Sequence, residues 1–170
     1  QRQMCIRDRV VDAARETLVD SIEVGPQPSS LVLDRFGKLW TVTDGRTAGI
    51  PAALYRIDAA TRRVEQTYTF AAGDHPSSVT LNGTRDTLYF INRDVWRMRV
   101  DAEELPVTPF LPYTQTTYYE VAVDPLTSEV YVADAIDYVQ HGVVYRFTAR
   151  GAAVDTIRVG ITPGSFCFKP

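Results

Sequence analysis

The feature that most constrains this sequence is an internal repeat with a period of about 45 residues. The segment Pro-Ser-Ser-Leu-Val-Leu-Asp at 28–34 recurs as Pro-Ser-Ser-Val-Thr-Leu-Asn at 76–82, and in weaker form as Tyr-Tyr-Glu-Val-Ala-Val-Asp at 118–124. A fourth copy of the repeat, at residues 160–168, aligns without a gap with residues 25–33. Such a period indicates a chain built from copies of one supersecondary unit.

The segments between these anchors repeat too, as short runs rich in β-branched and aromatic residues, which predict strands. A second strand is predicted at 39–42, 88–91 and 130–133, and a third at 54–58, 95–101 and 144–147. Fourth strands are predicted at 64–70, at a proline-interrupted 107–111 and at 154–159, with 18–24 left over from a preceding unit. No repeat shows helical periodicity.

Four short antiparallel strands in each repeat are typical of a β-propeller blade. We therefore predict an all-β fold of four-stranded antiparallel blades, labelled A to D from the channel outward. The sequence accounts for about three blades, with single strands at 18–24 and 164–168 at its two ends. Because propellers have four to eight blades, we expect this sequence to form only a partial ring.

Composition narrows the function classes. The chain is 45% hydrophobic and 23% charged, with a net charge of −3, which is typical of a globular domain. It has no run of Lys or Arg, so we expect no nucleic-acid partner. Its two cysteines, Cys5 and Cys167, are too few for a disulfide framework or a four-cysteine zinc site.

The two ends of the predicted blades differ in chemistry. The A–B turns carry the Asp, Asn, Gly and Pro residues of tight turns and are predicted to be structural. The B–C and D–A loops, on the opposite face, are longer and more varied, as expected of binding loops on a rigid scaffold. Asp44, Arg93 or Asp94, and Asp134 hold equivalent positions in the B–C loops and are expected to converge at the channel mouth.

The candidate ligand-binding residues are polar, charged or aromatic side chains of this loop face: Asp44, Arg46, Asn92, Arg93, Asp94, Tyr113, Gln115, Tyr118, Asp134, Asp137, Tyr138 and Gln140. Each aspartate could instead cap a turn or pair with a neighbouring arginine. Arg56, Arg97 and Arg146 follow an aromatic residue in the third strand of every repeat, which favours an architectural role for them.

The sequence matches no common catalytic template. It has no Gly-x-Ser-x-Gly elbow, no His-Glu-x-x-His helix, no P-loop and no dinucleotide fingerprint. We therefore expect no catalytic residue, no metal site and no enzymatic activity. A metal-dependent propeller hydrolase that uses loop carboxylates remains an alternative.

Several stretches together resemble a known family: 29–34, 39–45, 54–59, 81–89, 129–138 and 163–167. They look like the C-terminal half of the YncE-like, DUF5074-type seven-bladed propellers, and most of all like the surface lipoproteins of the BtuG type. This resemblance implies that residues 10–170 are the C-terminal part of the propeller domain. It also implies that the protein binds cobalamin (vitamin B12) or another corrinoid, with no catalytic cofactor, and passes it to a TonB-dependent outer-membrane transporter.

The same resemblance implies a place on the cell surface, at the outer membrane of a Gram-negative bacterium, with attachment through a lipid anchor outside this sequence. A propeller scaffold for protein docking, or for another small ligand, is the main alternative. Residues 1–9 depart from the resemblance and look like a translated sequencing-adapter remnant. We expect them to be a non-native leader that includes Cys5.

Overall fold

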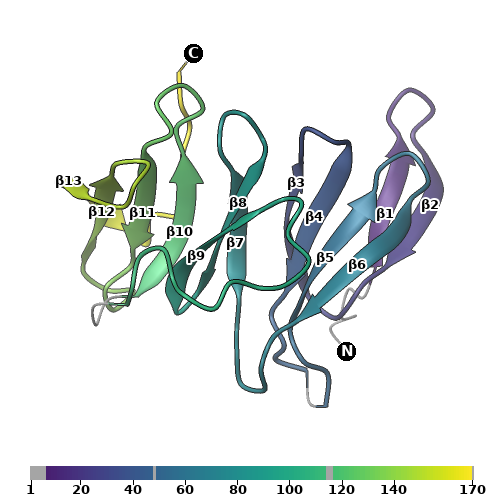
Figure 1. The fold of residues 1–170 in the computed structure, drawn as a ribbon, viewed down its shortest axis with the longest axis horizontal. Helices are drawn as coiled ribbons and strands as arrows, with labels where there is room; N and C mark the ends of the chain where they lie inside the picture. The colour runs from purple at the N-terminus through teal and green to yellow at the C-terminus, as the bar shows by residue number, and fades with distance from the viewer. Residues whose placement is uncertain (1–6, 48, 114–116, 170) are drawn as a thin grey trace. The chain divides into compact units, whose positions relative to one another are not determined.

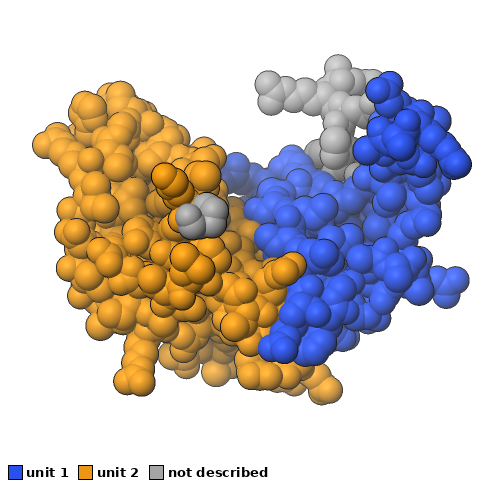
Figure 2. Space-filling model, turned by 90° about the horizontal axis from the view of Figure 1, so that it is seen from above, with its two compact units in different colours: residues 1–76 blue, residues 77–170 orange. Residues whose placement is uncertain are grey.

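The computed structural model of the chain describes residues 7–47, 49–113 and 117–169. These residues form thirteen β-strands and no helix, which confirms the all-β prediction. The chain divides into two compact units, residues 1–76 and residues 77–170, coloured separately in Figure 2.

The first unit contains two antiparallel sheets (Figure 1). One is two-stranded, β1 (Arg7–Asp12) and β2 (Thr17–Glu23); the other is four-stranded in the order β3 (Pro28–Leu33), β4 (Lys38–Thr43), β5 (Ala53–Asp58) and β6 (Arg63–Thr69). The four-stranded sheet matches a predicted A-to-D repeat. The strand predicted at 18–24 is not alone, because β2 pairs with β1, and residues 7–9 of the expected leader take part in that pairing.

The second unit contains a three-stranded and a four-stranded antiparallel sheet. The three-stranded sheet has the order β7 (Ser77–Leu81), β8 (Thr87–Asn92) and β9 (Asp94–Arg99). The four-stranded sheet has the order β10 (Tyr118–Val123), β11 (Val130–Asp134), β12 (His141–Phe147) and β13 (Ala153–Ile161). The predicted repeat thus reappears in this unit, with one strand missing from its first copy.

The missing strand is the proline-interrupted segment predicted at 107–111. Only an isolated antiparallel bridge between Val95 and Leu111 joins this segment to the edge of β9. Pro106, Pro109 and Pro112 lack the backbone N–H that a regular ladder needs, which explains why pairing stops after one bridge.

The C-terminal segment predicted as a strand at 164–168 has no regular secondary structure. No described strand pairs with it, and a strand is held by its ladder of hydrogen bonds. It still packs against the last sheet, because the rings of Phe166 and Phe168 lie 6.2 and 5.4 Å from that of Tyr131.

The repeated Pro-Ser-Ser motif forms a β-bulge. The register shifts between Ser29 and Val32 in β3 and between Ser77 and Thr80 in β7. The second serine of each motif, Ser30 or Ser78, has a positive φ of 57° or 51°. The motif therefore recurs because two strands require the same local distortion, which re-aims the residues that follow.

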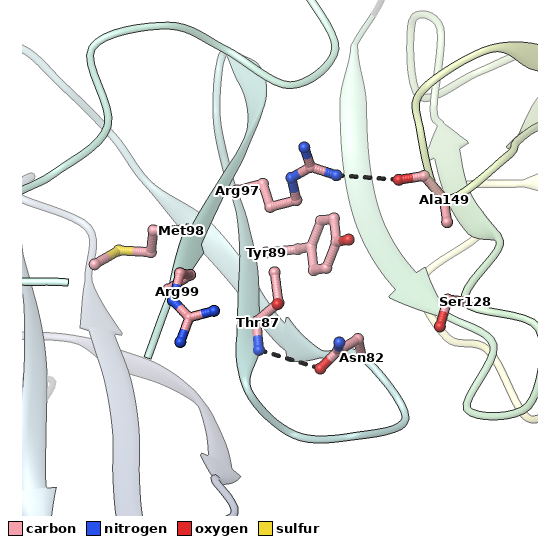
Figure 3. A pocket seen from close by; sticks show the side chains of 8 residues that line it. All are labelled: Asn82, Thr87, Tyr89, Arg97, Met98, Arg99, Ser128 and Ala149. Carbon is pink, nitrogen blue, oxygen red and sulfur yellow. Dashed lines mark hydrogen bonds between the residues drawn. The ribbon is translucent and has the colours of Figure 1, made fainter. Parts of the chain in front are cut away.

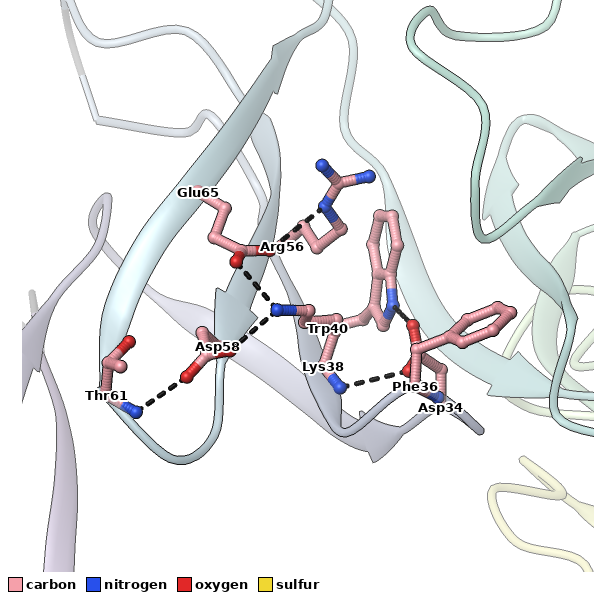
Figure 4. Close-up of polar contacts among 8 residues, drawn as sticks. All are labelled: Asp34, Phe36, Lys38, Trp40, Arg56, Asp58, Thr61 and Glu65. Atoms are coloured by element: carbon pink, nitrogen blue, oxygen red, sulfur yellow. Dashed lines mark hydrogen bonds and ion pairs between the residues drawn. The ribbon is translucent and has the colours of Figure 1, made fainter.

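A polar network stabilises the turn end of the four-stranded sheet in the first unit (Figure 4). The fully buried Trp40 donates its indole N–H to Oδ2 of Asp34 over 2.8 Å. The other oxygen of Asp34 accepts the backbone N–H groups of Phe36 and Lys38. Each hydrogen bond to this carboxylate contributes about 1.5–3 kcal/mol, so this A–B turn has the structural role predicted for it.

The second unit is stabilised by a core shared between its two sheets. Ile91 and Val95 of one sheet belong to the same buried cluster as Val121 and Val132 of the other. The hydroxyl of Ser78 donates to Glu120 and accepts the N–H of Val121, which joins β7 to β10. Apolar packing and polar pairing thus fix these two sheets together, and with them the loops at their ends.

Candidate functional site

In the first unit, the loop between β4 and β5 folds back on itself. Oδ1 of Asp44 accepts the backbone N–H of Arg46 over 3.0 Å, and its Oδ2 lies 3.6 Å from Nε of the same arginine. His75, on the connection after β6, contacts the carbonyl of Asp44 through Nδ1 over 2.8 Å. The predicted B–C and D–A loops therefore adjoin here, but Asp44 and Arg46 neutralise each other.

In the second unit, a tight turn between β8 and β9 lies against the segment that leads into β10. Arg93, with a φ of 59°, is the single residue between the paired Asn92 and Asp94. Asp94 accepts the N–H of Tyr113 over 2.7 Å, and the Arg93 guanidinium lies 4.6 Å from the centre of the Tyr113 ring. Three predicted residues, Arg93, Asp94 and Tyr113, are thus brought together.

Asp134 does not have the role predicted for it. It is 1% exposed, and its Oδ1 accepts the backbone N–H groups of Thr117 and Ile136 over 3.0 and 2.7 Å. The hydroxyl of Tyr145 donates to its other oxygen over 3.3 Å, and burial, followed by the charge of Asp134, raises the pKa of Tyr145. Asp134 therefore fixes the loop after β11, which corrects the expectation that it contacts a ligand.

That loop presents an exposed aromatic pair. Tyr138, with a φ of 64°, is 54% exposed, and its ring meets that of Tyr119 edge to face with centroids 5.8 Å apart. Sequence reasoning missed Tyr119, which is 39% exposed, because strict alternation places it opposite Tyr118. A register shift between Tyr118 and Glu120 breaks that alternation, and the adjacent tyrosines at the start of the strand are the signal that could have identified it.

The remaining predicted residues of this loop bind one another. Asp137 accepts the backbone N–H of Gln140 over 2.8 Å and the side-chain amide of Gln140 over 2.8 Å. These hydrogen bonds, with a further one from Val139, lower the pKa of Asp137. Both side chains stay exposed, so the pair forms a polar rim beside Tyr138.

Two further predicted residues, Tyr118 and Asn92, make local contacts at the ends of their strands. Tyr118 is half-buried and donates a long hydrogen bond of 3.5 Å to the carbonyl of Pro112. Asn92 ends β8, and its carbonyl accepts the indole N–H of Trp96. Gln115 lies outside the described residues.

The loop cluster of the second unit is defined here as Arg93, Asp94, Tyr113, Tyr119, Asp137, Tyr138 and Gln140. It offers one guanidinium group, two carboxylates, an amide and three tyrosine rings. Asp44 and Arg46 belong to the other compact unit. Across residues 7–47, 49–113 and 117–169, no three His, Cys, Asp or Glu side chains are grouped so that they could hold a metal ion.

No described helix is long and apolar enough to span a membrane.

No protein-family model matches the sequence, and neither does any functionally curated protein. The fold, however, is similar to several solved structures.

One of these structures is the hydrazine synthase of Kuenenia stuttgartiensis, with a TM-score of 0.70 and 13% identity over 91% of this chain and 44% of the other. A quinonprotein alcohol dehydrogenase-like protein from Bacteroides thetaiotaomicron has a TM-score of 0.64 and 16% identity, over 85% and 37% of the two chains. The Dos1 propeller has a TM-score of 0.64 and 12% identity, over 87% and 38%.

These similarities show the fold, which is that of a β-propeller made of antiparallel sheets, and they confirm the predicted architecture. The chain spans less than half the length of each of the three structures. At 12–16% identity they carry no information about activity.

Proposed function

We propose that this chain contributes to a cell-surface protein that captures cobalamin, or another corrinoid, and hands it to a TonB-dependent outer-membrane transporter. The observation that carries the proposal is the loop cluster, whose exposed tyrosine rings and hydrogen-bonding groups come from three loops at one end of the sheets of the second unit. Binding, with no catalytic cofactor, is the activity proposed.

The chemistry of the ligand fits such a cluster. Cobalamin is a large corrin ring fringed with amides, and it carries a phosphate. A site for it needs flat aromatic surface together with several groups that donate and accept hydrogen bonds. Tyr119 and Tyr138 offer the aromatic surface, while Arg93, Asp137 and Gln140 offer donors and acceptors.

The resemblance of the sequence to the YncE-like, BtuG-type propellers gives the proposal its ligand and its partner. It also supports the outer-membrane location, with a lipid anchor outside this sequence. The similarity of the fold to solved propellers is compatible with this family and with many others, because propellers host unrelated functions.

A docking surface for another protein is the second candidate. Its specific support is the apolar surface in the loop after β11, where Ile136 and Val139 are 39% and 73% exposed beside Tyr138. Exposed aliphatic side chains of this kind are common at protein–protein interfaces.

Calorimetric titration of cyanocobalamin into the 170-residue chain tests the proposal. We expect saturable binding that Arg93→Ala and Tyr138→Ala each weaken about three- to tenfold, because each loses a contact worth roughly 0.5–1.5 kcal/mol. Leu126→Ala is the matched control, since Leu126 is 76% exposed on a turn between β10 and β11 and should leave binding unchanged.

No saturation up to about 1 mM cyanocobalamin, which corresponds to a binding free energy weaker than about −4 kcal/mol, would overturn the proposal. Equal losses in Leu126→Ala and Tyr138→Ala would refute the loop assignment. Turnover of lactones that depends on an added divalent metal ion would instead favour the hydrolase alternative.

A further inference from the structure

The repeated arginine of the third strand is neutralised in two sheets and not in the third. Arg146 forms a bidentate pair with Glu129, with N–O distances of 3.0 and 2.9 Å. Arg56 lies 3.6 Å from a carboxylate oxygen of Glu65. Arg97 donates instead to the carbonyl of Ala149 over 3.0 Å, and no described carboxylate forms an ion pair with it.

The repeat itself explains why Arg97 lacks a carboxylate. Glu65 lies on β6, the fourth strand of its sheet, and the sheet of Arg97 has no regular fourth strand. Glu129 directly precedes β11, and the residue in the equivalent place before 88–91 is Thr87. Both positions that supply a carboxylate in the sister sheets are therefore changed around Arg97.

The uncompensated guanidinium lies on the wall of a solvent-open pocket of about 450 Å³ within the second unit (Figure 3). Its polar lining includes Asn82, Thr87, Tyr89, Arg97, Arg99 and Ser128, and no lining residue is a carboxylate. Arg99 is held by Asp101 in a bidentate pair with distances of 2.8 and 2.8 Å. Arg97 is therefore the guanidinium left to meet a ligand.

Arg97 is also held in place for that role. Its guanidinium lies 4.3 Å from the centre of the Phe110 ring, and the Phe110 ring meets the buried Tyr89 edge to face at 5.6 Å. One Nη1 hydrogen bond to Ala149 uses only part of the five N–H donors of the group. A planar guanidinium fixed on an aromatic ring, with donors to spare, suits bidentate recognition of an oxyanion.

We propose that this pocket binds a small ligand that carries an oxyanion, either a carboxylate or a phosphate, through Arg97 and the hydroxyl group of Ser128, since the hydroxyl of Thr87 already donates to Asp86. Its volume is that of a site for a sugar-sized molecule. Its walls include the turns that follow β7 and β10, at the opposite end of those strands from the loop cluster. This site is thus separate from the proposed corrinoid surface.

Titration of three anions into the full chain at constant ionic strength tests the proposal: inorganic phosphate, glucose 6-phosphate and glucuronate, with neutral glucose for comparison. We expect saturable binding of at least one anion and none of glucose. Preference for the phosphates or for glucuronate then identifies the class of oxyanion.

Two variants test the residue assignment. Arg97→Gln should weaken binding about tenfold or more, because a charge-assisted hydrogen bond is lost. Thr87→Glu supplies the carboxylate that the sister sheet has at Glu129, so it should abolish binding while the chain stays folded. Arg158→Gln, on exposed β13, removes the same charge elsewhere and should leave affinity unchanged.

Absence of saturable binding for all three anions up to about 10 mM would overturn the proposal, as would equal affinity in the parent chain and Arg97→Gln. Corrinoid binding is read separately by titrating the same variants with cyanocobalamin, so the failure of one proposal does not imply failure of the other.

Discussion

Replacement of Gly83 by alanine is the sharpest test of how the two sheets of the second unit pack. A Cβ atom added at Gly83 would overlap the carbonyl oxygen of Pro125 and would lie 2.6 Å from its carbonyl carbon and 2.9 Å from its Cα. All three are backbone atoms of the turn between β10 and β11, so no side-chain rotation can relieve the clash.

The size of the effect follows from this geometry. Carbon atoms make ordinary contact at about 3.4–4 Å, so relief of the 2.6 Å contact requires the two turns to separate by about 1 Å. Overpacking of this kind costs roughly 1–3 kcal/mol. The alanine also restricts the unfolded chain, which stabilises the protein by about 0.4–1 kcal/mol. The net loss in the free energy of unfolding is therefore between about 0 and 2.6 kcal/mol, with a central value of about 1.3 kcal/mol.

Thermal and urea unfolding of the 170-residue chain measure this loss. For a domain of this size, we expect Gly83→Ala to lower Tm by roughly 2–8 °C and to lower the urea midpoint without changing the slope. Gly160→Ala is the matched control, because a Cβ there meets no heavy atom within 4 Å. It should leave Tm unchanged or raise it slightly.

Equal Tm values for Gly83→Ala and Gly160→Ala would show that the two turns are not in contact in solution. The reasoning about the shared core, and with it the fixed relation of the loops within this unit, would then fail.

Three further substitutions test individual polar groups. Asp34→Ala should lower the free energy of unfolding by about 2–3 kcal/mol, since the indole of Trp40 loses its acceptor, and an unchanged urea midpoint would contradict this. Burial raises the pKa of Glu120. The free energy of unfolding therefore falls as the pH rises above the ordinary pKa of glutamate, because the ionised side chain is less favourable in the folded chain than in the unfolded chain. Glu120→Gln should therefore be more stable than the parent at pH 7.5 but not at pH 4, and a gain independent of pH would refute that. Hydrogen bonds from Lys38, and then from Thr61, lower the pKa of Asp58. The ionised Asp58 therefore stabilises the fold at pH values above the ordinary pKa of aspartate, and this stabilisation is lost as the pH falls below about 4. Asp58→Asn should flatten that acid loss in urea midpoints measured from pH 2 to 6, and identical profiles would count against the pairing.

Much of the fold could be predicted from the sequence because the repeat supplies several copies of the same pattern. The second strands are short runs rich in β-branched and aromatic residues, and the third strands share an aromatic residue before arginine, so β4, β5, β8 and β11 lie where they were expected. Prolines at 106, 109 and 112 also indicated that the fourth strand of one sheet would be irregular. What the pattern could not provide was the extent of pairing, which depends on backbone partners rather than on residue type.

The candidate site was less predictable because identical residue types serve different roles. Asp94 and Asp134 both end or follow a second strand, yet Asp134 is buried under three hydrogen bonds and Asp94 remains half-buried at a turn. Tyr119 was missed because a register shift changes which way it faces. Solvent access is a tertiary property, because it depends on which distant segments pack over a side chain, and the residue type alone does not encode it.

The irregular segment that replaces a fourth strand connects the two proposed sites of the second unit. It contributes Phe110, which supports Arg97 beside the pocket, and Tyr113, which lies against Arg93 in the loop cluster. A regular strand here would pair along β9 and could carry a carboxylate to Arg97, as β6 carries Glu65 to Arg56. In a scaffold of repeats, a feature shared by every copy serves the architecture, so the copy that departs from the pattern is where specific binding is most expected. By that argument, the proline-interrupted stretch between β9 and β10 serves both sites, because it places an aromatic ring against one arginine in each.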